Sequence, residues 1–260
     1  MTRKTIYLSR EKLKLPAKDF VLKEQILSVL VSNPAYGHRR IAIALGVGRK
    51  RVRRIMKLYG IKPFKRRRKW IKTHDFGKPP VKYENLIKNS FPLRPQVVYV
   101  GDFTYLRWNG NFIYFSTLMD QFTREIVGWN VSVRHTKEFV INTLLDAIKT
   151  RGRPYIIHTD QGSEYNSKEF TSFAEKLGIK VSMSKKGCPW ENGYQESYYD
   201  NFKVDLGLEY ERFESLGEFI EAIHQTVNYY NTKRIHTTLK MSPAQFAQKY
   251  LPAWSLIIII

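Results

Sequence analysis

Three acidic residues, Asp102, Asp160 and Glu196, stand where a carboxylate could do chemistry. Asp102 interrupts the apolar run VVYVGDFTYL, although Asp is disfavoured in strands and a buried charge needs a partner or a metal ion. Asp160 ends the strand pattern YIIHTD, and Glu196 lies in the helical pattern YQESYYDNFKVDL. Taken alone, each acid could be a cap, a turn residue or a surface charge. Together, with no His or Cys cluster nearby, three carboxylates suit Mg²⁺ or Mn²⁺, and two such ions would support phosphoryl transfer.

The elements around these acids follow a definite order. Alternating apolar residues predict three successive antiparallel strands, with a hairpin signal at Asn109-Gly110. Helix, strand, helix, strand and helix follow, and the whole series spans residues 96–108, 110–120, 123–132, 137–150, 155–160, 167–177, 179–184 and 194–206. This order predicts a ribonuclease H-like α/β fold, a mixed five-strand sheet with flanking helices. In that fold the first and fourth strands are neighbours, so Asp102 and Asp160 would face each other with the helix of Glu196 beside them.

The front of the chain has the pattern of a small all-helical domain. Helices are expected over residues 20–32, capped by Asp19, over 37–45, and from Arg49 onward after a short glycine turn. In the third helix an apolar face runs from Val52 to Tyr59. The cations that then point outward are Arg49, Lys50, Arg53 and Lys57. This arrangement predicts a helix-turn-helix whose last helix enters the major groove, and a solvated basic helix in a small bundle is the alternative.

The charge is concentrated at the front. Lys and Arg outnumber Asp and Glu by 44 to 23, and residues 1–80 hold 23 basic and 4 acidic residues. From Arg49 to Lys72 there are 13 basic residues and no acid. An excess of this size indicates a polyanionic partner, here double-stranded DNA. Further candidates for contact with phosphate are Arg66, Arg67 and Arg68 in this run and Lys185 and Lys186 in the loop KKGCPWENG.

Other classes of protein are excluded by what the sequence lacks. A single cysteine, Cys188, rules out an internal disulfide and a multi-cysteine zinc site. No apolar segment of the signal-peptide type follows the basic N-terminus, and the final run LIIII is too short to span a bilayer. We therefore expect a cytoplasmic protein without a membrane partner. Its expected parts are a helix-turn-helix region (1–62), a basic linker (63–92), the catalytic core (93–210) and a C-terminal helical extension (211–260).

The motifs carry a resemblance to a known family. Thirty-five residues separate Asp160 from Glu196. The stretches that carry the resemblance are VGDFTYL, FSTLMDQFTREIVGW, IIHTDQGSEYNS, SMSKKGCPWENGYQES and YYNTKRIHTTLKMSPAQF. Over about residues 95–246 the chain resembles the DDE transposases and retroviral integrase cores, most closely the second-frame transposases of bacterial insertion sequences. The match departs from the family at Glu191-Asn192-Gly193-Tyr194, where an Asp-Asn pair and small residues are usual.

The resemblance implies a function and roles for residues. Asp102, Asp160 and Glu196 would bind metal and catalyse strand cleavage at element ends and transfer into target DNA. Lys203, two helical turns after Glu196, would hold DNA near the cut, unless it is a solvated surface lysine. The family also implies a homo-oligomer on DNA in the bacterial nucleoid, and fusion to or partnership with an upstream product that binds the ends. A catalytically silent DNA-binding remnant or regulator, or a structure-selective nuclease on the same fold, are the alternatives.

Overall fold

The computed structural model describes residues 17–64, 83–88, 90–185, 188–207 and 209–250. The chain forms two compact units, which divide between Phe64 and Lys65, and each is described by itself. Four of the candidate DNA contacts lie outside the described residues: Arg66, Arg67, Arg68 and Lys186. The C-terminal isoleucine run lies outside them as well.

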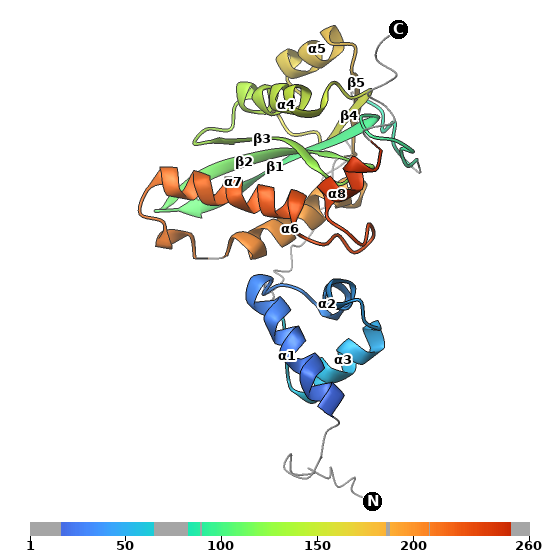
Figure 1. The fold of residues 1–260 in the computed structure, drawn as a ribbon. Coiled ribbons are helices and arrows are strands. Elements are labelled where there is room, and N and C mark those ends of the chain that lie inside the picture. Colours follow the sequence, from blue (N-terminus) through green and yellow to red (C-terminus); the bar gives the residue numbers. More distant parts are fainter. Residues whose placement is uncertain (1–16, 65–82, 89, 186–187, 208, 251–260) are drawn as a thin grey trace, which may run out of the picture. The chain divides into compact units, whose positions relative to one another are not determined.

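The described residues of the first unit form three helices, α1 (Ala17–Ser32), α2 (His38–Leu45) and α3 (Arg49–Leu58) (Figure 1). The turn between the last two lies at the expected glycines. Gly46 ends α2 with a φ of 64°, and Gly48 precedes the first residue of α3. Apolar side chains from all three helices fill the centre, among them Leu22, Ile26, Ile41, Val52 and Ile55.

Asp19 does not cap α1, contrary to the expectation from the sequence. The helix begins before it, at Ala17, and Asp19 is buried in the first turn. Both carboxylate oxygens accept a hydrogen bond from Nη2 of Arg54 in α3, at 2.7 and 2.8 Å. The hydrogen bond from Arg54 lowers the pKa of Asp19. The residue therefore ties α1 to α3, which a local capping pattern cannot reveal because the partner is 35 residues away.

In the second unit, the described residues form one mixed sheet of five strands in the order β3-β2-β1-β4-β5. The strands β1 (Val98–Trp108), β2 (Asn111–Asp120) and β3 (Ile126–Ser132) are antiparallel. The strands β4 (Ile156–Thr159) and β5 (Lys180–Met183) run parallel to β1. The β1–β2 hairpin turns at Asn109 and Gly110, whose φ angles of 46° and 77° are those of a type I′ turn. The predicted ribonuclease H-like fold is confirmed.

Helices cover both faces of this sheet (Figure 1). On one face α4 (Lys137–Arg151) and α5 (Lys168–Lys176) bury Tyr99, Phe139, Leu144, Ile157 and Phe170. On the other face α6 (Gly193–Leu206) and α7 (Leu216–Thr232) bury Phe115, Tyr198, Phe202, Phe219 and Ile223. The short helix α8 (Pro243–Gln248) follows α7. Among the helices that the structure describes, none is both long and apolar enough to cross a membrane.

The helix α4 lies unusually close to β3. A Cβ atom at Gly128 of β3 would stand 2.5 Å from the carbonyl oxygen of Thr143 and 2.6 Å from Cβ of Ala147. Small side chains therefore make this contact, and Thr143 and Ala147 are buried. Leu145, which the apolar periodicity would place in the core, is 46% exposed instead. The contact with Gly128 of β3 decides which side chains of α4 are buried. The sequence of the helix alone does not reveal this contact.

Candidate active site

The pairing of β1 with β4 brings Asp102 and Asp160 together. Val100 is the register partner of His158, and the parallel ladder ends at this pair. Continuing the register by two residues would place Asp102 opposite Asp160, which directly follows β4. Both side chains are half-buried. The two acids therefore stand side by side at the carboxyl end of β4, the edge at which open α/β sheets hold their sites.

Three polar side chains dock the start of α6 onto β1. Gln195 Nε2 donates to the carbonyl of Val100 at 2.5 Å, and Asn192 Nδ2 donates to the carbonyl of Gly101 at 3.2 Å. The Tyr199 hydroxyl donates to the carbonyl of Asp102 at 2.6 Å. These contacts bind three consecutive residues of β1 just where β4 leaves the strand, and they fix the helix that carries Glu196 beside Asp102.

These docking residues were missed by the sequence reasoning, although a signal was present. Asn192, Gln195 and Tyr199 are spaced i, i+3 and i+7, so they share one helical face next to Glu196. The departure from the family pattern at Glu191 is also explained. Its carboxylate accepts hydrogen bonds from Asn85 Nδ2 at 2.9 Å and from the backbone N–H of Lys185 at 2.8 Å. Glu191 thus closes the loop that leads into α6.

The surroundings of Asp102 disfavour its charged form. Burial and the nearby charges of Asp160 and Glu196 raise the pKa of Asp102 to about 8. A hydrogen bond from the backbone N–H of Phe103, at 2.8 Å, and the charge of Lys203 act in the opposite direction but do not cancel this effect. Asp160 and Glu196 therefore both lie within electrostatic range of Asp102.

Asp160 also has a raised pKa. Burial is the main cause, the nearby Glu164 adds to it, and a hydrogen bond from the backbone N–H of Gly162 opposes it. Glu164 itself is buried, which acts to raise its pKa, but hydrogen bonds from His135 and Ser163 bring that pKa below its ordinary value. His135 Nδ1 lies 2.6 Å from the carboxylate of Glu164. Glu164 therefore lies next to Asp160 as an ionised carboxylate, held by His135 and Ser163.

Glu196 is exposed on the first turn of α6. Among the described residues, no three His, Cys, Asp or Glu side chains are grouped as the ligands of a metal ion. Asp102 and Asp160 thus lie side by side at the end of the β1–β4 ladder, and the three predicted acids are not gathered into one ligand set. Asp102 and Asp160 are half-buried, and the side chain of Glu196 lies at the solvent side.

Lys203 faces the same end of β1. Its Nζ atom donates to the hydroxyl of Thr104 at 2.6 Å and lies 5.8 Å from the centre of the Tyr105 ring. It is half-buried and close enough to Asp102 to lower that residue's pKa. Lys203 is therefore not a freely solvated surface lysine.

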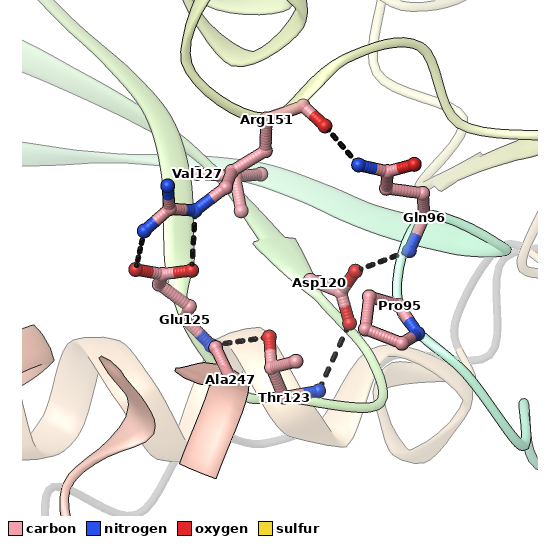
Figure 2. Close-up of a pocket in the computed structure, with 8 residues that line it drawn as sticks. All are labelled: Pro95, Gln96, Asp120, Thr123, Glu125, Val127, Arg151 and Ala247. Atoms are coloured by element: carbon pink, nitrogen blue, oxygen red, sulfur yellow. Dashed lines mark hydrogen bonds and ion pairs between the residues drawn. The ribbon is translucent and has the colours of Figure 1, made fainter. Parts of the chain in front are cut away.

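A second set of buried acids differs from the candidate site and shows what a structural carboxylate looks like here (Figure 2). Asp120 accepts hydrogen bonds from the backbone N–H groups of Gln96, Phe122 and Thr123, at 2.7 to 2.9 Å. Glu125 forms a bidentate ion pair with Arg151 at 2.8 and 2.9 Å. Among the described residues, no cation pairs in this way with Asp102 or Asp160.

The C-terminal extension anchors the far end of α6. Arg234, which is 1% exposed, donates from Nε to Asp205 at 2.5 Å and from Nη2 to Asn201 at 2.7 Å. Both acceptors lie on α6 beyond Glu196. The motif YYNTKRIHTTL contains Arg234. It therefore has a structural role, because Arg234 fixes the C-terminal half of α6.

The described candidates for DNA contact occupy separate places. Arg49, Lys50, Arg53 and Lys57 are all exposed on α3. The opposite side of the helix is buried through Val52, Ile55 and Met56, as the periodicity predicts. Lys185 is exposed in the loop after β5.

The fold of the second unit is that of the integrase core class. Residues 92–189 match one family model described as "Integrase core domain", and residues 177–243 match a second with the same description. The HTLV-2 integrase catalytic core domain has the same fold, with a TM-score of 0.52, 22% identity, and coverage of 60% of this chain and 98% of that one. The simian T-cell lymphotropic virus intasome gives a TM-score of 0.55 at 19% identity and covers 85% of this chain and 73% of that chain.

Similarity over almost the whole length gives the family within this class. The transposase for insertion sequence element IS904 of Lactococcus lactis is 34% identical over 88% of this chain and 94% of its own length. The putative transposase InsK for element IS150 of Escherichia coli is 28% identical over 96% of this chain and 91% of its own. The chain belongs to the transposases of bacterial insertion sequences, DDE-type enzymes with an integrase core domain.

Proposed function

We propose that this transposase cuts DNA at the ends of its element and joins the freed 3′ ends to target DNA, with Asp102, Asp160 and Glu196 as the catalytic acids. The observation that carries the proposal is the cluster itself. Asp102, half-buried and with no paired cation among the described residues, lies within electrostatic range of half-buried Asp160 and of Glu196 on α6. Such a cluster opposes folding unless positive charge is added, so it fits a binding site for cations.

The donor set fits Mg²⁺ or Mn²⁺, since every donor is a carboxylate oxygen. The HTLV-2 integrase catalytic core was solved in complex with magnesium, which supports the same choice here. Asp102 and Asp160 would hold the metal from the sheet, and the exposed Glu196 would complete the set from α6. When bound, a pair of divalent ions activates the attacking oxygen and stabilises the leaving oxygen in phosphoryl transfer.

The chain's own residues would then place the DNA strand. Lys203, beside Asp102, would hold a phosphate near the cut, because a lysine is a compact point charge suited to that role. Lys185 and Lys186, in the loop before α6, would contact phosphates further along. The exposed cations of α3, with Arg66, Arg67 and Arg68, would bind duplex DNA with the first unit acting as a helix-turn-helix.

The larger setting belongs to the same proposal. Retroviral intasomes are assemblies, and the similarity to one supports action as an oligomer on DNA. We also propose the division into residues 1–62, 63–92, 93–210 and 211–260, cytoplasmic action at the nucleoid, and cooperation with an upstream product that binds the element ends.

The test uses the full chain, Mg²⁺ and a labelled duplex that carries the element end. We expect nicking and joining that EDTA removes. Glu196→Gln should remove both reactions and leave DNA affinity, measured by gel shift, within a few-fold of the wild type. Glu221→Gln on α7, another exposed helical glutamate, is the matched control and should cut normally.

Other outcomes separate the alternatives. Cutting without joining would indicate a nuclease, and binding without cutting would indicate a silent DNA-binding protein. Nicking by Glu196→Gln at the wild-type rate would contradict the assignment of Glu196.

A further inference from the structure

An exposed aromatic pair lies on the β1–β2 hairpin. Tyr105 is 60% exposed and Phe112 is 50% exposed, although both lie within strands of the central sheet. Their rings pack edge to face, with centroids 5.1 Å apart and an angle of 76°. Large aromatic side chains that are exposed together on a sheet indicate a binding surface.

The strand that carries Tyr105 has an open edge. β1 pairs with β4 only from Val98 to Val100, while its other edge pairs with β2 up to Trp108. In the described part of the chain, the β4-side edge of β1 therefore has no strand partner beyond Val100. Asp102 lies on this open segment, and Tyr105 follows it three residues later. At the rise of a β-strand their Cα atoms are separated by roughly 10 Å, and because side chains alternate along a strand, Asp102 and Tyr105 project from opposite faces of the sheet.

The charge around the pair suits a polyanion. The Nζ atom of Lys203 lies 5.8 Å from the centre of the Tyr105 ring. Arg107 is exposed and is the register partner of Phe112. Between Asp102 and Asp120 the sequence contains no acid. Aromatic rings with nearby cations are the combination that binds single-stranded nucleic acid, through stacking on bases and attraction to phosphates.

We propose that Tyr105 and Phe112 form a stacking site for unpaired nucleotide bases on the β1–β2 hairpin, further along β1 from Asp102. The site rests on the proposed function, because its distance from the reaction depends on Asp102 being catalytic. In a duplex each base is stacked on its neighbours, so an exposed ring can take up only an unpaired or terminal base.

A second protein chain is a poorer occupant for this surface. Addition of a strand to the open edge of β1 would need free backbone groups next to Val100. Asn192 already binds the carbonyl of Gly101, which points to this edge. Strand addition is therefore obstructed at the end of the segment nearest the acids.

The experiment compares two fluorescein-labelled duplexes of one sequence, one blunt and one with three unpaired thymidines at a 3′ end. Binding by the full chain is measured by fluorescence anisotropy in EDTA, so that no cleavage occurs. The ratio of the two dissociation constants cancels the non-specific affinity of the basic front. We expect the wild type to prefer the overhang by about 5-fold to 100-fold, the range for one stacked base. Tyr105→Leu and Phe112→Leu should bring the ratio close to one.

Two controls separate stacking from general effects. Tyr105→Phe keeps the ring and should keep the ratio. Tyr155 is 52% exposed, has Lys180 Nζ 4.8 Å from its ring centre, and lies at the opposite end of β4 from Asp160. Tyr155→Leu therefore removes the same chemistry from a different place and should also keep the ratio.

The remaining outcomes are decisive. No overhang preference in the wild type, or an unchanged ratio in Tyr105→Leu and Phe112→Leu, overturns the stacking site. A change of oligomeric mass in Tyr105→Leu by analytical ultracentrifugation also overturns it and assigns the surface to protein contact. Cleavage with Mg²⁺ is measured separately on the wild type. Normal cleavage without a preference for the overhang would contradict only the proposal of a stacking site. A preference for the overhang without cleavage would contradict only the proposed function.

Discussion

At the residue scale, Asp102 is distinguished by the fact that its ionised side chain lowers the stability of the fold. Asp120 is also buried, but it accepts three backbone hydrogen bonds, and buried Glu125 has an arginine. Asp102 has one backbone hydrogen bond and two acidic neighbours that raise its pKa. A carboxylate kept in such a place lowers stability, which is expected where function selects the residue.

This cost gives a prediction with a definite pH dependence. Burial and the neighbouring acids raise the pKa of Asp102 from 3.8 to about 8, so the folded chain retains a proton that the unfolded chain releases between these values. Stability is therefore lost progressively as pH rises from about 4 to about 8. We expect Asp102→Asn to stabilise the metal-free chain by roughly 2 kcal/mol at pH 8 and hardly at all at pH 4. Thermal unfolding in EDTA at both pH values measures the difference.

The control for this prediction lies on α6. Asp200→Asn changes an exposed acid and should leave the midpoint of unfolding unchanged at both pH values. Equal stabilisation by Asp102→Asn at pH 4 and pH 8 would show that the charge of Asp102 is not the cause.

Lys203 carries a second residue-scale prediction. Lys203→Ala should lower nicking and joining at element ends more than it lowers binding to random duplex, because one phosphate contact is lost among many. Thr104→Val is the matched control, since it removes the hydroxyl that Lys203 binds but keeps the charge. If both variants lose activity equally, Lys203 serves only to hold Thr104. If neither does, it has no part near the cut.

At the scale of elements, the sequence could predict the strands, the helices and their order because each follows a local pattern. The Asn109-Gly110 turn and the alternation on either side place the hairpin correctly. What could not be predicted depends on partners far apart in the chain. The carbonyls of β1 that hold α6 and the Arg54 partner of Asp19 are of this kind. Backbone acceptors leave no trace in the sequence, so the spacing of Asn192, Gln195 and Tyr199 could indicate a shared polar face but not the β1 carbonyls that it binds.

The anchoring of α6 by Arg234 can be tested as a pair. Arg234→Met leaves Asp205 buried without the guanidinium and should cost about 3 to 5 kcal/mol of unfolding free energy. Arg234→Met combined with Asp205→Leu should cost clearly less than the sum of the two single changes, because the orphaned charge is removed as well. Urea unfolding of the four proteins completes the cycle. Costs that add to within about 0.5 kcal/mol would mean that the two side chains act independently.

At the scale of the whole molecule, the charge divides between the two units. The 13 basic residues from Arg49 to Lys72 begin with α3 of the first unit. Not all are available to DNA, since Arg54 pairs with Asp19 and Arg51 donates to the carbonyl of Lys18. The second unit holds the fold of the integrase core and the three acids. Residues next to the core also belong to it structurally, because Ile87 packs on Val98 and Val100.

The last prediction follows from this division. Each neutralised phosphate contributes about −0.9 to the slope of log K against log salt. If the four exposed cations of α3 each contact one phosphate, deleting residues 1–64 should flatten the slope by about 3.6. The deletion keeps residues 83–88 on the core and should retain weak Mn²⁺-dependent nicking at high protein concentration. In the full chain, changing Arg49, Lys50, Arg53 and Lys57 to Gln should reproduce most of the loss. The same change at four exposed lysines of the second unit, Lys149, Lys168, Lys176 and Lys249, should alter the slope much less. Salt titration of duplex binding measures all four proteins, and equal slopes for the full chain and the deletion would show that the first unit does not bind DNA.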